Sequence, residues 1–196
     1  LCDRRQRQMC IRDSTVYKVQ MEGLMRLKAM AKINLGLDVL GKREDGYHEV
    51  RMIMQTIRMY DILDIRKTRR PGIVLTTNLP FIPTDQRNLV YKAAQMLMEE
   101  FDVEEGLSIK LRKFIPVAAG MAGGSSDAAA AFVGVNRMFH LGLTEEQLME
   151  RAVKVGADVP YCIMRGTALA EGIGEKLTRL PRLSLIHISE PTRLGM

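Results

Sequence analysis

The residues best suited to chemistry lie in one glycine-rich run, residues 116–131, which reads P-V-A-A-G-M-A-G-G-S-S-D-A-A-A-A. Glycine adopts backbone angles that other residues avoid and lets a ligand approach the main chain closely. Ser125, Ser126 and Asp127 are typical of a helix start, and the alanines that follow favour helix. Such a turn points several backbone N–H groups and the positive end of a helix at one place. The run therefore predicts an anion site, ideally for phosphate.

The spacing within this run excludes two familiar phosphate-binding motifs. No G-K-[ST] follows the glycines, so the run is not a Walker A loop. The glycine spacing also differs from the dinucleotide-binding fingerprint. The alternative is a tight strand-to-helix turn without a ligand, and the length of the run and its G-G-S-S-D ending favour phosphate over that alternative.

Four further residues could act on a substrate, each with an ordinary alternative. Lys32 lies in a segment of alternating apolar residues. Either its side chain extends so that the ammonium reaches solvent, or the ammonium has a functional role. Asp158, in G-A-D-V-P, is a candidate general base or a turn-forming aspartate. His48 alone is more typical of a surface or structural histidine. Tyr47 could stack on a base or pack in the core.

The segments around these residues predict a set of strands. Residues 26–40 read as extended, because apolar and polar residues alternate from Ile33 to Val39. Residues 48–67 predict two strands with a break at Tyr60 and Asp61. Residues 73–77 predict a short strand, the alternation at 107–111 a half-buried strand, and residues 167–180 a hairpin.

Helices are predicted between these strands. Asn88 can cap a helix that continues to about Phe101. A second helix is expected over residues 125–139, and the capping box at Thr144 opens a third that ends near Val155. Residues 156–160 read as a loop. Helices interspersed among strands favour an α+β fold over a doubly wound sheet.

Composition limits the class of protein. The chain has 196 residues, 46% of them hydrophobic and 27% charged, which suits one globular domain. We expect a cytoplasmic protein, because no apolar run could cross a bilayer and the N-terminus lacks a secretory signal. The three cysteines fit no zinc or disulfide framework, and Cys162 reads as a small buried hydrophobe. Residues 1–20 supply +3 of the net charge of +6, and the mild remaining charge suits an anionic small ligand and does not by itself indicate nucleic acid.

The two ends differ from the middle of the sequence. Residues 1–20 show no sustained period, and residues 183–196 break off without a stop signal. We expect both to be non-native or disordered tails, which leaves residues 21–182 as the folded domain.

The glycine-rich run resembles the ATP-phosphate loop of the GHMP kinases, P-x-A-A-G-L-A-G-G-S-S-D-A-A-A, with Met121 in place of the usual Leu. The resemblance implies a GHMP N-terminal domain, similar to domain 2 of ribosomal protein S5, with a mixed sheet and helices packed on one face. It also implies that Ser125 or Ser126 helps to hold Mg²⁺. The implied ATP-binding residues of the run are Pro116, Ala118, Ala119, Gly120, Met121, Ala122, Gly123, Gly124, Ser125 and Ser126.

The segment K-A-M-A-K-I-N-L, with the later D-G-Y-H, resembles a subfamily, the 4-diphosphocytidyl-2-C-methyl-D-erythritol kinases. This resemblance implies that Lys32 and Asn34 face the reacting hydroxyl. Tyr47 and His48 would hold the cytidine end of the substrate. Asp158 would be the catalytic base, held ionised by Lys32. The implied contacts of the adenine and nucleotide are Asn88, Leu89 and Lys113.

The implied reaction is ATP-dependent phosphorylation of a small cytidine-diphosphate-bearing substrate at its 2-hydroxyl, with Mg²⁺, in a monomer or homodimer that binds neither nucleic acid nor membrane. Family members continue into a C-terminal domain with a third glycine-rich motif, which is absent after residue 182. We therefore expect the 196-residue chain to have weak or no activity. The alternatives are a homoserine or phosphomevalonate kinase, a non-catalytic fragment, and an RNA-binding S5-like module, against which the 5% aromatic content argues.

Overall fold

The computed structural model describes residues 16–17, 23–42, 44, 46 and 48–181. Its centre is a seven-stranded sheet in the order β1-β2-β3-β5-β4, with β6 paired to β3 and β7 to β6. All pairs are antiparallel except β4 with β5, so the sheet is mixed. The strands are β1 (Val16–Tyr17), β2 (Leu24–Lys42), β3 (His48–Thr68), β4 (Ile73–Thr77), β5 (Gly106–Arg112), β6 (Thr167–Gly172) and β7 (Lys176–Arg179).

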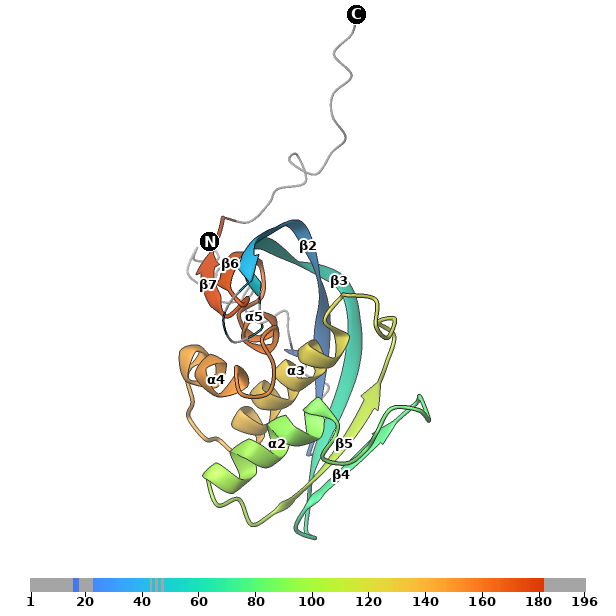
Figure 1. Ribbon diagram of the computed structural model, residues 1–196. Coiled ribbons are helices and arrows are strands. Elements are labelled where there is room, and N and C mark those ends of the chain that lie inside the picture. Colours follow the sequence, from blue (N-terminus) through green and yellow to red (C-terminus); the bar gives the residue numbers. More distant parts are fainter. Residues whose placement is uncertain (1–15, 18–22, 43, 45, 47, 182–196) are drawn as a thin grey trace, which may run out of the picture.

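The helices gather on one face of this sheet, as Figure 1 shows. They are α2 (Leu89–Glu100), α3 (Gly123–Met138), α4 (Glu145–Ala152) and α5 (Val159–Met164). The predicted α+β fold with a mixed sheet and helices on one face is confirmed. The tails predicted at 1–20 and 183–196 lie outside the described residues, except for β1, which pairs with β2.

The prediction of two strands between residues 48 and 67 was wrong, because β3 is one continuous strand. The irregularity lies before Tyr60: β2 advances from Met30 to Lys32 while β3 moves from Tyr60 back to Thr56, which is a β-bulge. Asp61 does not break the strand. Its side chain is fully buried on the same face as Leu63, so the carboxylate points into the domain.

The core lies between the sheet and the helices, and α3 is its central element. Residues 128–131 of α3 are four buried alanines, which let the helix approach the sheet closely. At Gly134 a Cβ atom would lie 2.4 Å from Ile65 Cδ1 and 2.7 Å from Leu27 Cδ1. The middle and the C-terminal half of α3 therefore lie close against β2 and β3.

The far half of β2 is not part of this core. The segment is extended, as the alternation predicted, and every residue from 33 to 42 is exposed. Large apolar side chains on this segment include Leu35, Leu37, Val39 and Leu40. The two long strands β2 and β3 thus extend beyond the layer of helices (Figure 1). Among the described residues, no helix has the length and apolar character that a bilayer crossing requires.

Candidate active site

The glycine-rich loop, residues 116–122, leads directly into α3. Gly120, Ala118 and Ala122 all have positive φ, at 71°, 61° and 53°. For the two alanines this backbone is unfavourable, and such strain is common where a loop is shaped for a ligand. Ala122 is the N-cap of α3 and supplies no side-chain hydrogen bond to the helix. The first N–H groups of α3 therefore have no capping side chain and remain available to a ligand.

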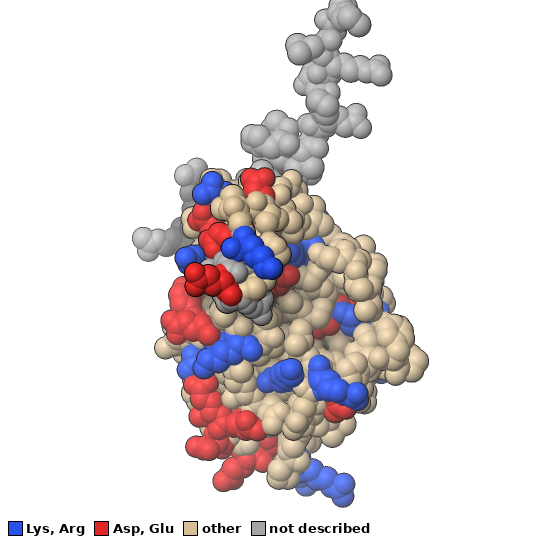
Figure 2. Space-filling model, viewed as in Figure 1, with Lys and Arg blue, Asp and Glu red and all other residues tan. Residues whose placement is uncertain are grey.

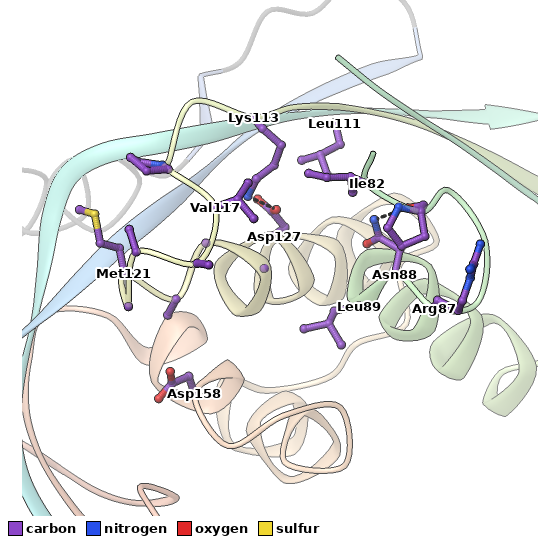
Figure 3. Close-up of a pocket in the computed structure, with 18 residues that line it drawn as sticks. Ile82, Arg87, Asn88, Leu89, Leu111, Lys113, Val117, Met121, Asp127 and Asp158 are labelled. Carbon is purple, nitrogen blue, oxygen red and sulfur yellow. Dashed lines mark hydrogen bonds and ion pairs between the residues drawn. The ribbon is translucent and has the colours of Figure 1, made fainter. Parts of the chain in front are cut away.

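A cavity of about 460 Å³ opens against this loop. Its size is in the range of pockets that hold nucleotide-sized ligands. The loop forms one wall, and Asp158 lies apart from Asn88 and Arg87 across the cavity in Figure 3. The lining residues that share a polar or charged side chain are Arg87, Asn88, Lys113, Asp127 and Asp158.

Lys32 and Asp158 meet at the α5 side of the site. Lys32 Nζ lies 3.6 Å from Asp158 Oδ1 and donates to Asn34 Oδ1 at 2.9 Å. Lys32 is only 4% exposed, so it is not the surface lysine of the alternative interpretation. Its backbone N–H also donates to the carbonyl of Met121, at 3.1 Å, which joins β2 to the glycine-rich loop. The structure thus brings the loop and both charged residues together.

The position of Asp158 leaves its carboxylate available. Asp158 is the N-cap of α5, where an aspartate commonly accepts a hydrogen bond from the second or third N–H of the helix. Here no such bond forms, and the second helical residue is Pro160, which has no N–H. The Asp158 side chain is 33% exposed, so a substrate hydroxyl can reach it.

Lys113 is neutralised below the loop. Its ammonium donates to Asp127 Oδ2 at 2.6 Å and to Asp61. Burial alone lowers the pKa of Lys113, but the two carboxylates outweigh it and the pKa is raised. Burial, more than any other influence, holds the pKa of Asp127 well above its usual range. Neither Asp61 nor Asp127 was a predicted site residue. The sequence signal for Asp61 was its inward position in the alternation Asp61, Leu63, Ile65.

The two candidate magnesium-binding serines differ in their surroundings. Ser126 is buried, and its hydroxyl donates to the carbonyl of Met30 at 2.6 Å. Ser125 is half-buried, and within the described part of the chain its hydroxyl has no hydrogen-bond partner. Of the two, Ser125 is therefore the side chain that could still ligate a metal.

The end of the cavity away from Asp158 has both apolar and polar lining residues, Arg87 among them. Ile82, Pro83 and Leu89 line it together with Asn88. The amide of Asn88 caps α2 by accepting from Val90 N at 2.9 Å, and it donates to the carbonyl of Pro83 at 2.7 Å. Asn88 thus shapes this end by holding the preceding loop against α2. Ile82 and Pro83 were not predicted.

The residues predicted to contact the substrate are Asn34, at the reacting hydroxyl, and Tyr47 and His48, at the cytidine end. Asn34 is exposed and bonds to Lys32. His48 is exposed at the start of β3 and does not line the cavity, and Tyr47 lies outside the described residues. In Figure 2 acidic side chains gather over α4 and the end of α2, so this face is not the uniformly basic surface typical of nucleic-acid binding.

Comparison with known proteins agrees with this geometry. The family model "GHMP kinases N terminal domain" matches residues 88–166. A "4-diphosphocytidyl-2-C-methyl-D-erythritol kinase" of Lachnospira eligens is 57% identical over 164 residues, which are 84% of this chain and 57% of that protein. The enzyme of the same name from Lachnoclostridium phytofermentans is 58% identical over 158 residues, 81% of this chain and 54% of that protein.

Solved structures show the same fold. A crystal structure of 4-(cytidine 5'-diphospho)-2C-methyl-D-erythritol kinase aligns with a TM-score of 0.70 at 35% identity, over 80% of this chain and 55% of the other. Homoserine kinase from Cytophaga hutchinsonii aligns with a TM-score of 0.67 at 19% identity, over 84% and 54% of the two chains, and shares the fold alone. The chain spans about half the length of the curated relatives it matches.

Proposed function

The chain carries the N-terminal domain of a GHMP kinase, and from this we propose that it forms the ATP-binding part of an enzyme that phosphorylates the 2-hydroxyl of 4-diphosphocytidyl-2-C-methyl-D-erythritol. The observation that carries the proposal is the convergence of three features on one cavity. These are the uncapped N-terminus of α3, the glycine-rich loop, and the pair formed by Lys32 and Asp158. The names of the relatives support this substrate over homoserine or phosphomevalonate.

The glycine-rich loop would bind the polyphosphate of ATP. Phosphoryl transfer requires mainly positioning of the groups and neutralisation of their charge. Backbone N–H groups at the start of α3 supply hydrogen bonds, and the helix dipole adds positive potential at the same place. The adenine would pack against the apolar side chains of Leu89 and Ile82.

Asp158 would act as the general base. Its carboxylate accepts the proton of the substrate 2-hydroxyl while that oxygen attacks the terminal phosphorus of ATP, and ADP leaves. Lys32 would orient Asp158 and offset charge on the transferred phosphoryl group. Asn34 fixes the direction of the Lys32 ammonium through the 2.9 Å hydrogen bond.

The donor set fits a magnesium ion held largely by the nucleotide. Among the described residues, no group of three or more His, Cys, Asp or Glu side chains could hold a metal by itself. Mg²⁺ typically uses few protein ligands together with substrate phosphates, and Ser125 would be one such ligand. When bound, the ion neutralises phosphate charge.

The substrate would be a small molecule with a cytidine diphosphate group, in the cytoplasm. Asn34 lies beside Lys32, on the side where the reacting hydroxyl would sit. His48, at the start of β3, and Tyr47 are the proposed contacts of the cytidine end, as the resemblance implies.

Asp158→Asn tests the proposal. Nucleotide binding is measured by calorimetry on the chain itself, and turnover is measured in the complete enzyme. ATP binding should be retained, whereas kcat should fall by about 10²–10⁴-fold because the base is lost. Asp38→Asn, which changes an exposed carboxylate elsewhere on β2, is the matched control and should leave both quantities unchanged. Unchanged turnover in Asp158→Asn would remove this residue from the mechanism.

A further inference from the structure

A second buried cluster of charges lies beneath the glycine-rich loop. It consists of Lys113 from the end of β5, Asp61 from β3 and Asp127 from α3. Each of the three side chains is 5% exposed or less. One ammonium therefore joins two carboxylates that belong to different elements. Burying three charges is costly unless each has partners, so the partners decide what the cluster does.

Asp61 also binds the main chain that leads into the loop. Its Oδ1 accepts the N–H of Ile115 at 2.8 Å and the N–H of Phe114. These are the last two amides before Pro116, where the loop begins. Because Asp61 belongs to β3, which has partners on both edges, this first end of the loop is attached to the interior of the sheet.

The second end of the loop is fixed through Asp127, in α3. Gly123, at the start of the helix, makes room for the ion pair. A Cβ atom there would lie 3.1 Å from Lys113 Nζ and 3.2 Å from Ile115 Cγ2. The ion pair between Lys113 and Asp127 thus joins the segment before the glycine-rich loop to the helix after it, across fourteen residues of sequence.

The two carboxylates are unequally satisfied. Asp61 accepts from Lys113 and from two backbone amides, whereas Asp127 accepts from Lys113 on Oδ2, and its buried Oδ1 has no partner among the described residues. Burial also raises the pKa of Asp127, so this carboxylate holds a proton more readily than an exposed one. Asp61 is therefore the stronger of the two attachments.

We propose that Asp61 is a positioning residue for the nucleotide phosphates. It holds the loop and Lys113 so that the N–H groups at the start of α3 converge on the polyphosphate. Its contacts are with the loop backbone and with Lys113. This inference rests on the proposed function, because it takes the loop to be the phosphate site.

The test is Asp61→Asn in the 196-residue chain, with ATP and adenosine titrated by NMR. The new amide would direct N–H groups at the Lys113 ammonium and displace the loop. We expect the Kd for ATP to rise at least about 10-fold and the Kd for adenosine to change less than about 2-fold. Asp64→Asn is the matched control. It changes an ion-paired aspartate three residues along the same strand, on the opposite face of the sheet, bound to Arg26 and Arg112. Its Kd for ATP should match the wild type.

Hydrogen exchange gives a readout without a ligand. The Phe114 and Ile115 amides should exchange at least about 10-fold faster in Asp61→Asn than in Asp64→Asn, because their acceptor is weakened. Unchanged exchange, or equal weakening of ATP and adenosine, would overturn the inference. ATP binding that is lost already in the wild type would instead refute the proposed function.

A second variant covers the case in which Asp61→Asn does not fold. Asp127→Asn keeps Asp61 and its backbone contacts, so a smaller effect of the same kind is expected: a Kd for ATP raised by about 2- to 5-fold, with adenosine unchanged. A loss of the same size for both ligands would contradict the positioning role.

Discussion

Lys32, Asp61 and Asp127 are charged side chains buried among small and apolar residues, and their neighbours explain why each is tolerated. Lys32 has Asp158 and Asn34, while the two aspartates share Lys113. From the sequence, the loop itself was recognisable because glycine, serine and alanine occur there in an unusual combination. Asp61 was not recognised, because a single carboxylate in a strand gives no sign of the lysine that meets it 52 residues later.

Cys162 is another buried side chain, and its burial affects how its thiol ionises. It is buried in α5, as the sequence predicted, and burial raises the pKa of its thiol to about 12. An unfolded thiol has a pKa of about 8.5, so the contribution of the protonated thiol to stability is complete below that pH and is lost as the pH rises towards 12.

We therefore expect Cys162 in the folded chain to resist alkylation at pH 8 and to react at the ordinary rate in urea. Peptide mapping by mass spectrometry after iodoacetamide treatment identifies the modified residue. The denatured chain is the control for intrinsic reactivity. Rapid labelling of Cys162 in the native chain would show that α5 opens far more readily than its burial indicates.

The short helix α5 positions Asp158 in the site. Its six residues are all buried, and it presents Asp158 at its first end. Tyr161 fixes it to the sheet: the hydroxyl donates to the Gly166 carbonyl at 2.7 Å and lies 3.1 Å from Thr56 Oγ1. Thr56 is the residue that pairs with Lys32 across β2 and β3. The spacing of Lys32 and Asp158 therefore depends on this second link.

Tyr161→Phe removes only the hydroxyl and should lower the free energy of unfolding by about 1 kcal/mol, because the half-buried Gly166 carbonyl loses its side-chain donor and keeps only the Thr56 N–H. Urea unfolding at pH 7 measures the change. Tyr60→Phe is the control, because the Tyr60 ring lies under Lys28 on the other face of the sheet and should tolerate the change within about 0.5 kcal/mol. Equal losses in the two variants would refute the special role of Tyr161.

The sequence predicted elements with local signals well. Asn88 caps α2, and Thr144 forms its capping box with Gln147 at α4. The short strand β5 and the hairpin β6–β7 also lie where alternation and glycines indicated. Helix α5 was missed: six apolar residues with a proline near the start resemble a loop followed by a buried strand. Its helical form depends on packing against α3 and α4, which no local pattern records.

At the scale of the whole molecule, a large apolar surface is exposed on the far half of β2 in the part of the chain that the structure describes. Leu37 is 53% exposed and Val39 61%, and the described part of β1 pairs only with Arg26 and Leu27 near the other end of β2. An apolar strand at a sheet edge promotes association between chains. The alternation at 33–39 could not reveal this, because a period of two indicates a strand but not whether anything covers it.

Leu37→Lys together with Val39→Lys should therefore reduce self-association of the chain, while its unfolding free energy changes by less than about 0.5 kcal/mol. Light scattering at increasing protein concentration measures the first quantity and urea unfolding the second. Val74→Lys, at an equally exposed apolar residue on β4, serves as the control for added charge. If Val74→Lys reduces self-association as much as the double substitution does, the extension of β2 is not the associating surface.

Strand β3 pairs with three other strands, and these pairings set the order in which the site can form on the ribosome. One edge of β3 pairs with β2, which precedes it, while the other edge pairs with β5 at residues 62–68 and with β6 at residues 50–55. A nascent chain can close the β2–β3 hairpin early, because that contact is local. Lys32 can pair with Asp158 only after Asp158 has been synthesised. The hydrogen bond that holds α5 forms only after Gly166 and β6 have left the ribosome. The pair of Lys32 and Asp158 is thus assembled near the end of translation of this domain, after the glycine-rich loop.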